Sequence, residues 1–153
     1  MNIAVAADEM TGVAGPLVEL LRARGHNLLL HGVYAPDERD DWAWASARAA
    51  ADVASGRAEQ AVVACWTGTG ASIAANKVPG VRAALCVDAK TAEDARRWND
   101  ANVLALSLRS TSAAELEEIL DAWLAASASE DLTDTQNVAH LAELESSHRP
   151  VDD

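Results

Sequence analysis

The sequence of 153 residues predicts an α/β protein: a Rossmann-like three-layer α/β/α sandwich with a five-stranded parallel sheet. Short apolar runs rich in Val, Ile and Leu alternate along the chain with segments of helical periodicity. The apolar runs lack the polar alternation of a sheet that has one face in water, so each strand is expected to be buried on both faces. Strands that alternate with helices in this way form parallel sheets joined by right-handed crossovers.

The individual elements follow from that alternation. Glycines mark the expected helix ends, because Gly25 follows the first helix, Gly56 the second and Gly80 the third. We expect strands at 2–7, 27–33, 61–65, 81–87 and 102–107, and helices near 13–24, 41–55, 70–77, 90–98, 111–126 and, more weakly, 134–147. Residues 1–126 are therefore expected to form a single Rossmann-like domain, and residues 127–153 a C-terminal tail helix that is available to pack on a dimer partner.

Composition and charge exclude several classes of protein. The formal net charge of −12, without a cluster of Lys and Arg, argues against a nucleic-acid partner. No apolar stretch approaches the thickness of a bilayer and the N-terminus has no basic region, so we expect no membrane partner and no signal peptide. Cys65 and Cys86 lie in apolar runs without metal-ligand spacing, which predicts reduced thiols, a cytoplasmic protein and no metal site.

Cys65 is the most informative residue for chemistry. It ends an apolar run and is followed by a glycine loop, Trp66 to Gly70, that begins a helix. A thiol facing backbone N–H groups and the positive end of a helix dipole is expected to have a lowered pKa and to act as a thiolate. The alternative is a core position, because a free cysteine at the end of a strand is more often simply buried.

Other polar residues are expected at the same edge of the sheet, because ligands of such folds bind beyond the carboxyl ends of the strands. Each has a structural alternative, since a strand-end Asp is commonly a helix cap or turn residue and an arginine is commonly solvated. The candidates are Asp8 and Glu9 after the first strand, Asp88 after the fourth, where a helix cap is favoured, and Ser107 to Arg109 after the fifth.

The glycine loop also admits a dinucleotide-binding interpretation. Gly68-x-Gly70-x-x-Ile73 follows a strand, begins a helix and has Asp88 about 20 residues further on. However, the third glycine is missing, the strand is the third rather than the first, and Trp66 would crowd a pyrophosphate. Nicotinamide binding is therefore disfavoured.

Three sequence strings are similar to a known family. They are CWTGTGASIAANK at 65–77, GVRAALC at 80–86 and NDANVLAL at 99–106. Together they resemble ribose-5-phosphate isomerase B and the galactose-6-phosphate isomerase subunits, over about residues 1–126. The resemblance implies Rossmann-type dimers, in some members paired into a dimer of dimers, whose active sites are shared across the subunit interface. It also implies interconversion of an aldose and a ketose through a cis-enediolate, without a metal or organic cofactor.

The resemblance assigns roles to particular residues. Cys65 aligns with the catalytic base, and the N–H groups around Gly68 and Gly70 align with the oxyanion cradle. Thr67 aligns with a hydroxyl that relays protons, Asp8 and Asn99 with residues that contact the sugar, and Arg109 with a basic position after the fifth strand.

The chain also departs from the family pattern. Glu9 stands where the family has a phosphate-holding His, and Trp98 where it has a ring-opening His. Trp66 replaces a glycine, and Trp42 replaces a tyrosine. The C-terminal arginines that clamp phosphate are missing, because no Lys or Arg occurs between Arg109 and Arg149.

These departures predict a changed substrate. We expect Trp42, Trp66 and Trp98 to line the pocket and to favour a neutral sugar or a sugar with a bulky apolar group. In that hypothesis Cys65 is the base of an aldose–ketose isomerase, with Asp8, Glu9, Thr67 and Asn99 orienting the sugar. The alternative is a diverged homologue that acts as a sugar-binding module, or as the partner subunit of another isomerase, in which the tryptophans fill a degenerated site.

Overall fold

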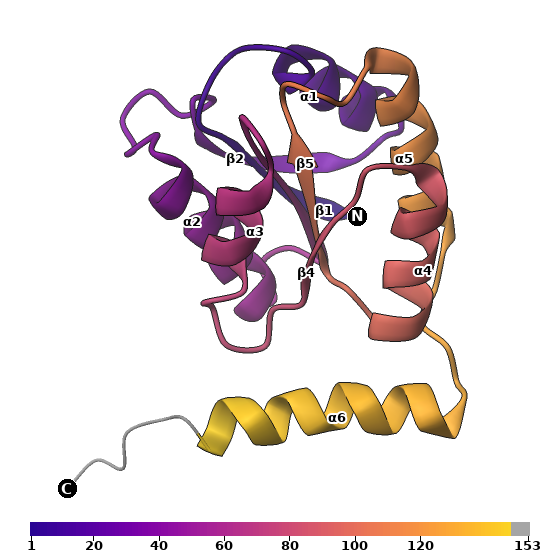
Figure 1. Ribbon diagram of the computed structural model, residues 1–153. Helices are drawn as coiled ribbons and strands as arrows, with labels where there is room; N and C mark the ends of the chain where they lie inside the picture. Colours follow the sequence, from indigo (N-terminus) through magenta and orange to yellow (C-terminus); the bar gives the residue numbers. More distant parts are fainter. Residues whose placement is uncertain (148–153) are drawn as a thin grey trace, which may run out of the picture.

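The structure, a computed structural model, describes residues 1–147, which form five strands and six helices (Figure 1). The last six residues of the expected tail, 148–153, lie outside the described part. The elements in chain order are β1 (Asn2–Ala7), α1 (Ala14–Ala23), β2 (Asn27–Gly32), α2 (Trp42–Ala54), β3 (Gln60–Cys65), α3 (Thr69–Ala75), β4 (Ala83–Leu85), α4 (Ala89–Asn99), β5 (Val103–Ser107), α5 (Ala113–Ala125) and α6 (Leu132–Ser147). The predicted α/β fold and five-stranded parallel sheet are confirmed.

The strands are ordered β2-β1-β3-β5-β4, and all neighbouring pairs are parallel. The carboxyl ends of the strands therefore share one edge of the sheet. At that edge Cys65 of β3 is in register with Ser107 of β5, and Ala7 of β1 with Ala64 of β3. This register brings the segments after β1, β3 and β5 together.

The two faces of the sheet have different cores. Helices α1, α4 and α5 cover one face with large side chains, including Leu17, Leu120 and the fully buried Trp123. Helices α2 and α3 cover the other face, and alanines such as Ala45 and Ala71 dominate that core (Figure 1). Small side chains let α2 and α3 lie close to the sheet and to each other, which places the start of α2 beside the glycine loop after β3.

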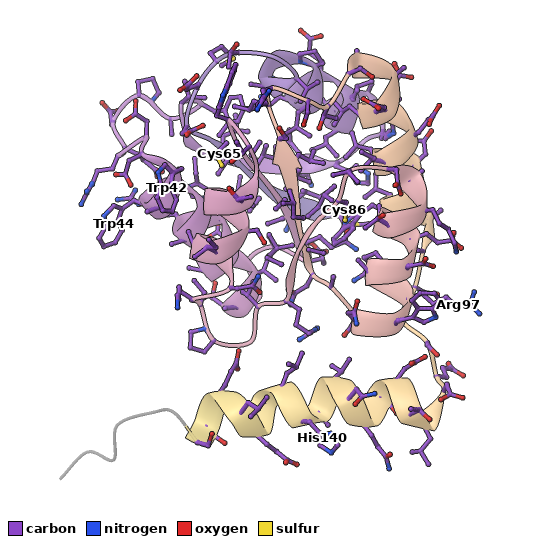
Figure 2. All side chains as sticks on the ribbon, viewed as in Figure 1. Trp42, Trp44, Cys65, Cys86, Arg97 and His140 are labelled. Carbon is purple, nitrogen blue, oxygen red and sulfur yellow. The ribbon has the colours of Figure 1, made fainter. Side chains whose placement is uncertain are left out.

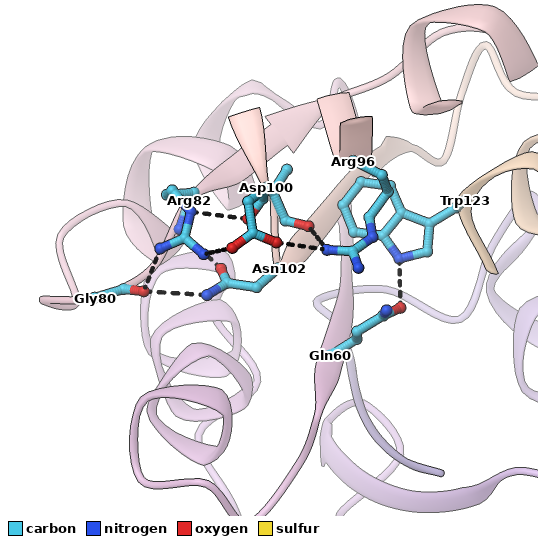
Figure 3. Close-up of polar contacts among 8 residues, drawn as sticks. Gln60, Gly80, Arg82, Arg96, Asp100, Asn102 and Trp123 are labelled. Carbon is cyan, nitrogen blue, oxygen red and sulfur yellow. Dashed lines mark hydrogen bonds and ion pairs between the residues drawn. The ribbon is translucent and has the colours of Figure 1, made fainter. Parts of the chain in front are cut away.

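Strand β4 is shorter than the predicted 81–87, because side-chain amides bind the backbone where a strand would begin. The N–H of Arg82 donates to Asn102 Oδ1 at 2.8 Å, and that of Ala83 to Asn76 Oδ1 at 2.8 Å. Figure 3 shows the surrounding network, in which the Arg82 guanidinium also donates to Asp100 Oδ2 at 2.8 Å. These bonds fix the connection between α4 and β5, where Asp100 adopts a positive φ of 43°.

Asp88 is a helix cap, as favoured above. Its carboxylate accepts a hydrogen bond from the N–H of Thr91 at 2.7 Å at the start of α4. This role leaves the dinucleotide interpretation without its acidic residue.

Helix α6 lies apart from the three layers (Figure 1), and none of its residues is buried. Glu145 connects it to the body by accepting a hydrogen bond from the N–H of Gly80 at 3.0 Å. Across residues 1–147, no helix combines the length and apolar character needed to cross a membrane.

Candidate active site

Cys65 ends β3 and opens onto a pocket of about 300 Å³ at the carboxyl edge of the sheet (Figure 2). Its side chain is 5% exposed and belongs to the alanine-rich core, but its sulfur also faces the start of α3. The N–H of Ala71 donates to Cys65 Sγ at 3.4 Å. The pocket is lined by Asp8, Trp42, Cys65, Trp66, Thr67, Thr69 and Gly70.

Gly68 shapes the loop between β3 and α3. Its φ of +78° is in the left-handed region, and an added Cβ would stand 2.9 Å from the carbonyl oxygen of Leu106 in β5. Its N–H donates to the carbonyl of Cys65 at 3.1 Å. The N–H of Gly68, one of the donors expected around the oxyanion, is therefore already used within the loop.

The first turn of α3 offers other donors. The N–H groups of the first helical residues have no intrahelical acceptor, so those of Thr69 and Gly70 are available to a ligand in the pocket. The hydroxyl oxygens of Thr67 and Thr69 are 2.7 Å apart and share a hydrogen bond. Thr69 was missed by the sequence reasoning, although its position directly after Gly68 is a signal that could have identified it.

Asp8 lies across the pocket from this loop and is partly buried. Burial raises the pKa of the Asp8 carboxyl above its ordinary value, and the charges of Glu9 and Asp40 act in the same direction. Backbone hydrogen bonds lower the pKa without reversing the shift. One carboxylate oxygen, Oδ1, is buried and has no hydrogen-bond partner among residues 1–147. A raised pKa increases the fraction of the Asp8 carboxyl that carries a proton, compared with an ordinary aspartate.

Trp42 and Trp66 form apolar walls of the pocket, as expected from the sequence. Trp42 begins α2 and is 46% exposed, and Trp66 follows Cys65 and is 51% exposed. The carbonyl of Trp66 accepts hydrogen bonds from Ser107 Oγ at 2.9 Å and from the N–H of Arg109 at 3.1 Å. Arg109 therefore stands beside the pocket with an exposed side chain, without contributing to its lining.

Three expected site residues do not line the Cys65 pocket within one chain. Glu9 is exposed and is not among the residues that line the pocket. Trp98 and Asn99 end α4 and border separate pockets beside α6, together with residues such as Leu141. The reason is topological: α4 returns the chain to the amino edge of the sheet, where β5 begins, whereas Cys65 lies at the carboxyl edge.

The pocket can therefore supply a thiol, hydroxyls, helical N–H donors and a carboxyl with a raised pKa. Its lining contains no cationic side chain. Within the described residues, no group of three or more His, Cys, Asp or Glu side chains could hold a metal ion. This chemistry suits proton transfer.

Fold and site define the chain as an α/β isomerase, and comparison with known proteins identifies its family. The profile of the ribose/galactose isomerase family matches residues 3–141, and the chain belongs to this family. It is 37% identical to the galactose-6-phosphate isomerase subunit LacB of Clostridium acetobutylicum over 127 residues, which is 82% of this chain and 73% of that protein. It is 33% identical to the 4-deoxy-4-sulfo-D-erythrose isomerase of Clostridium sp. (strain MSTE9), covering 69% of this chain and 67% of that protein.

A solved structure agrees with these sequence comparisons. The ribose-5-phosphate isomerase B of Clostridium thermocellum superposes with a TM-score of 0.86 at 31% identity, covering 97% of this chain and 100% of that one. The resemblance noted from the three sequence strings is thereby confirmed, and the chain is an aldose–ketose isomerase.

Proposed function

We propose that the chain interconverts an aldose and a ketose through a cis-enediolate, with Cys65 as the base. The observation that carries this proposal is the position of Cys65 Sγ, which lines the pocket and accepts a hydrogen bond from the first turn of α3. The Cys65 thiolate removes the proton from C2 of the open-chain aldose and returns it to C1. The electron pair left by the C–H bond forms the enediolate and then the ketose.

The remaining donors fit the other parts of that reaction. The N–H groups of Thr69 and Gly70 stabilise the oxyanion, and preorganised donors of this kind are worth a few kcal/mol of the barrier. The Thr67 hydroxyl transfers a proton between the two substrate oxygens, supported by Thr69. Asp8 serves as the acid that opens the sugar ring, and its raised pKa increases the fraction of the carboxyl that is protonated and able to act. A thiolate base requires a reduced Cys65, and on that ground we propose a cytoplasmic protein.

The substrate that we propose is a sugar without a phosphate, or a sugar that bears an apolar group. A phosphate dianion needs cationic partners, and the pocket lining combines indole rings with Asp8. If the sugar carries an anionic group, we assign the binding of that group to Arg109, which lies beside Trp66. A substrate without a phosphate has a precedent among the relatives, because the sugar named for the Clostridium sp. relative carries a sulfo group and no phosphate.

We also propose a homodimer in which each subunit completes the other's site. Trp98 and Asn99 end α4 at the amino edge of the sheet, far from the pocket of their own chain. A symmetric dimer would bring them to the Cys65 pocket of the second subunit. The exposed apolar side chains of Trp98 and Leu141 on that face support burial against a partner.

The second candidate is a catalytically diverged subunit that binds sugar or completes another isomerase. The presence of Trp98 instead of a ring-opening histidine favours it.

Exchange of the C2 proton into deuterated water separates the two. We expect Cys65-dependent exchange on a non-phosphorylated aldose or ketose, measured by NMR on a panel of free and phosphorylated sugars. Exchange confined to ribose 5-phosphate would overturn the substrate proposal, and an absence of exchange on every sugar would favour the diverged subunit.

A further inference from the structure

A charged cluster around the buried side chains of His31 and Asp52 is not used by the proposed mechanism. His31, at the end of β2, stands between two carboxylates: its Nδ1 is 3.0 Å from Glu38 Oε2, and its Nε2 is 2.8 Å from Asp52 Oδ2. Asp52 is fully buried in α2 and His31 is 9% exposed. Each ring nitrogen is thus within hydrogen-bond distance of a carboxylate oxygen, so the His31 ring bridges the segment after β2 to helix α2.

Arginines complete the cluster. Arg48 of α2 donates to the second oxygen of Glu38 at 3.0 Å, and Arg57 pairs with the second oxygen of Asp52. Partial burial acts to raise the pKa of Glu38, but the hydrogen bond and charge of His31 and the pairing with Arg48 outweigh it and lower the pKa. Glu38 therefore remains ionised and bound to both β2 and α2 at neutral pH.

Glu38 belongs to the connecting segment 33–41, which leads directly into the pocket wall. Asp41 ends this segment and caps α2 by accepting a hydrogen bond from the N–H of Trp44 at 3.1 Å. Trp42 follows and lies against Gly70, while the charge of Asp40 reaches Asp8. Backbone hydrogen bonds hold the first half of the segment. The N–H of Val33 donates to the carbonyl of Ala7 at 2.9 Å, and the N–H of Glu38 donates to the carbonyl of Ala35 at 2.9 Å.

We propose that His31 is a positioning residue: by bridging Glu38 and Asp52, it fixes segment 33–41 and so holds Trp42 as one wall of the Cys65 pocket. The catalytic consequence rests on the proposed function. The groups that face the ring are Glu38 and Asp52, with Arg48 and Arg57 behind them.

The test compares His31→Gln and Glu38→Gln with Asp121→Asn. The last variant breaks the Arg24–Asp121 ion pair between α1 and α5, away from the pocket, and serves as a matched control. Amide hydrogen–deuterium exchange of segment 33–44 is measured without substrate. We expect exchange in this segment to accelerate about tenfold or more in both variants, with the rest of the sheet and the control unchanged. The double variant His31→Gln/Glu38→Gln should show the same amide exchange rate in segment 33–44 as each single variant. The reason is that both substitutions remove the link between His31 and Glu38.

The kinetic arm uses the sugar that the exchange experiment identifies. We expect KM to rise about tenfold with kcat changed less than threefold, because Trp42 positions the substrate and does not transfer the proton. A merely structural role would lower the amount of folded enzyme and leave KM unchanged. Unchanged amide exchange at 33–44 in the milder Glu38→Gln variant would overturn the proposal, whether or not the protein is an isomerase. Faster exchange without any isomerase activity would leave the positioning intact and refute only the proposed function.

Discussion

The indole ring of Trp42 lies against the backbone of Gly70, so close that a Cβ atom added to Gly70 would stand 2.9 Å from Trp42 Cε3. This contact joins the start of α2 to the first turn of α3. It excludes any side chain at Gly70 and makes the tryptophan part of the wall around the N–H donors. The geometry around the N–H groups of Thr69 and Gly70 therefore depends on a residue that lies far away in the sequence.

Gly70→Ala should damage the pocket by displacing Trp42. We expect KM to rise and the free energy of unfolding to fall by about 1–3 kcal/mol, as for other overpacked sites. Trp42→Leu in the same chain should recover most of the lost stability, because the smaller side chain leaves room for the methyl group. Urea unfolding of the two single variants and the double variant measures this coupling. Strictly additive losses would show that the two residues do not compete for the same space.

Cys65→Ala should abolish catalysis without unfolding the protein. We expect C2-proton exchange to fall by about 10²–10⁴-fold, the usual contribution of a general base. Cys86→Ala is the matched control, because Cys86 is also buried at the end of an apolar run. Burial, assisted by the charge of Asp88, raises the pKa of Cys86 to about 12, so this thiol stays protonated at neutral pH. Equal loss of exchange in both variants would exclude a specific role for Cys65.

Asp8→Asn should lower the activity and raise the stability of the protein. The folded-state pKa of Asp8 is raised above 3.8, so this carboxyl favours folding below that pH and loses its favourable contribution as the pH rises through the folded value. At pH 7 the ionised group is unfavourable, because Oδ1 has no partner within residues 1–147. We expect the amide to raise the free energy of unfolding at pH 7 by about 1 kcal/mol while ring opening slows. Calorimetry and kinetics with a cyclic sugar measure the two effects, and a destabilised variant would contradict the argument.

Glu38→Gln should change the acid sensitivity of the fold. The folded-state pKa of Glu38 is lowered from 4.5, so its contribution is present above pH 4.5 and is lost as the pH falls through the folded value. We expect the wild type to lose stability more steeply than the variant below pH 4.5, by about 1 kcal/mol for this partly exposed pair. The urea midpoints of the wild type and of Glu38→Gln, measured between pH 3 and about 7, should converge at the acid end of this range. Parallel curves would mean that the His31–Glu38 contact does not form in solution.

Mixing two inactive variants tests the shared active site. In a symmetric dimer, a Cys65→Ala subunit paired with an Asn99→Ala subunit has one site with both native residues. Random reassortment of the two homodimers makes about half of the dimers mixed, and each mixed dimer has one intact site of its two. The mixture should therefore recover about one quarter of the wild-type activity. Cys65→Ala mixed with Cys65→Ala/Asn99→Ala is the control and should stay inactive. If Cys65 and Asn99 acted within one chain, neither mixture would recover.

The sequence predicted most of the fold because its signals are local. Buried parallel strands are continuous apolar runs, and helices carry a repeating apolar face, so element type and order were correct throughout residues 1–147. The predicted start of β4 was wrong, since Asn76 and Asn102 bind the backbone there from positions that no local pattern identifies. Asp88 was correctly favoured as a cap because its spacing to the following helix is itself a local signal.

By itself, the sequence determined the parallel sheet and the presence of a thiol at the end of its third strand, since both depend on apolar periodicity and on residue type along a short stretch. Only the tertiary structure decided which polar groups meet Cys65. It brought Asp8 and Trp42 to the pocket, occupied the N–H of Gly68, and left Trp98 and Asn99 at the opposite edge. The physical reason is that strand order and crossover direction set which chain segments share an edge of the sheet, and these are long-range properties of the packed core.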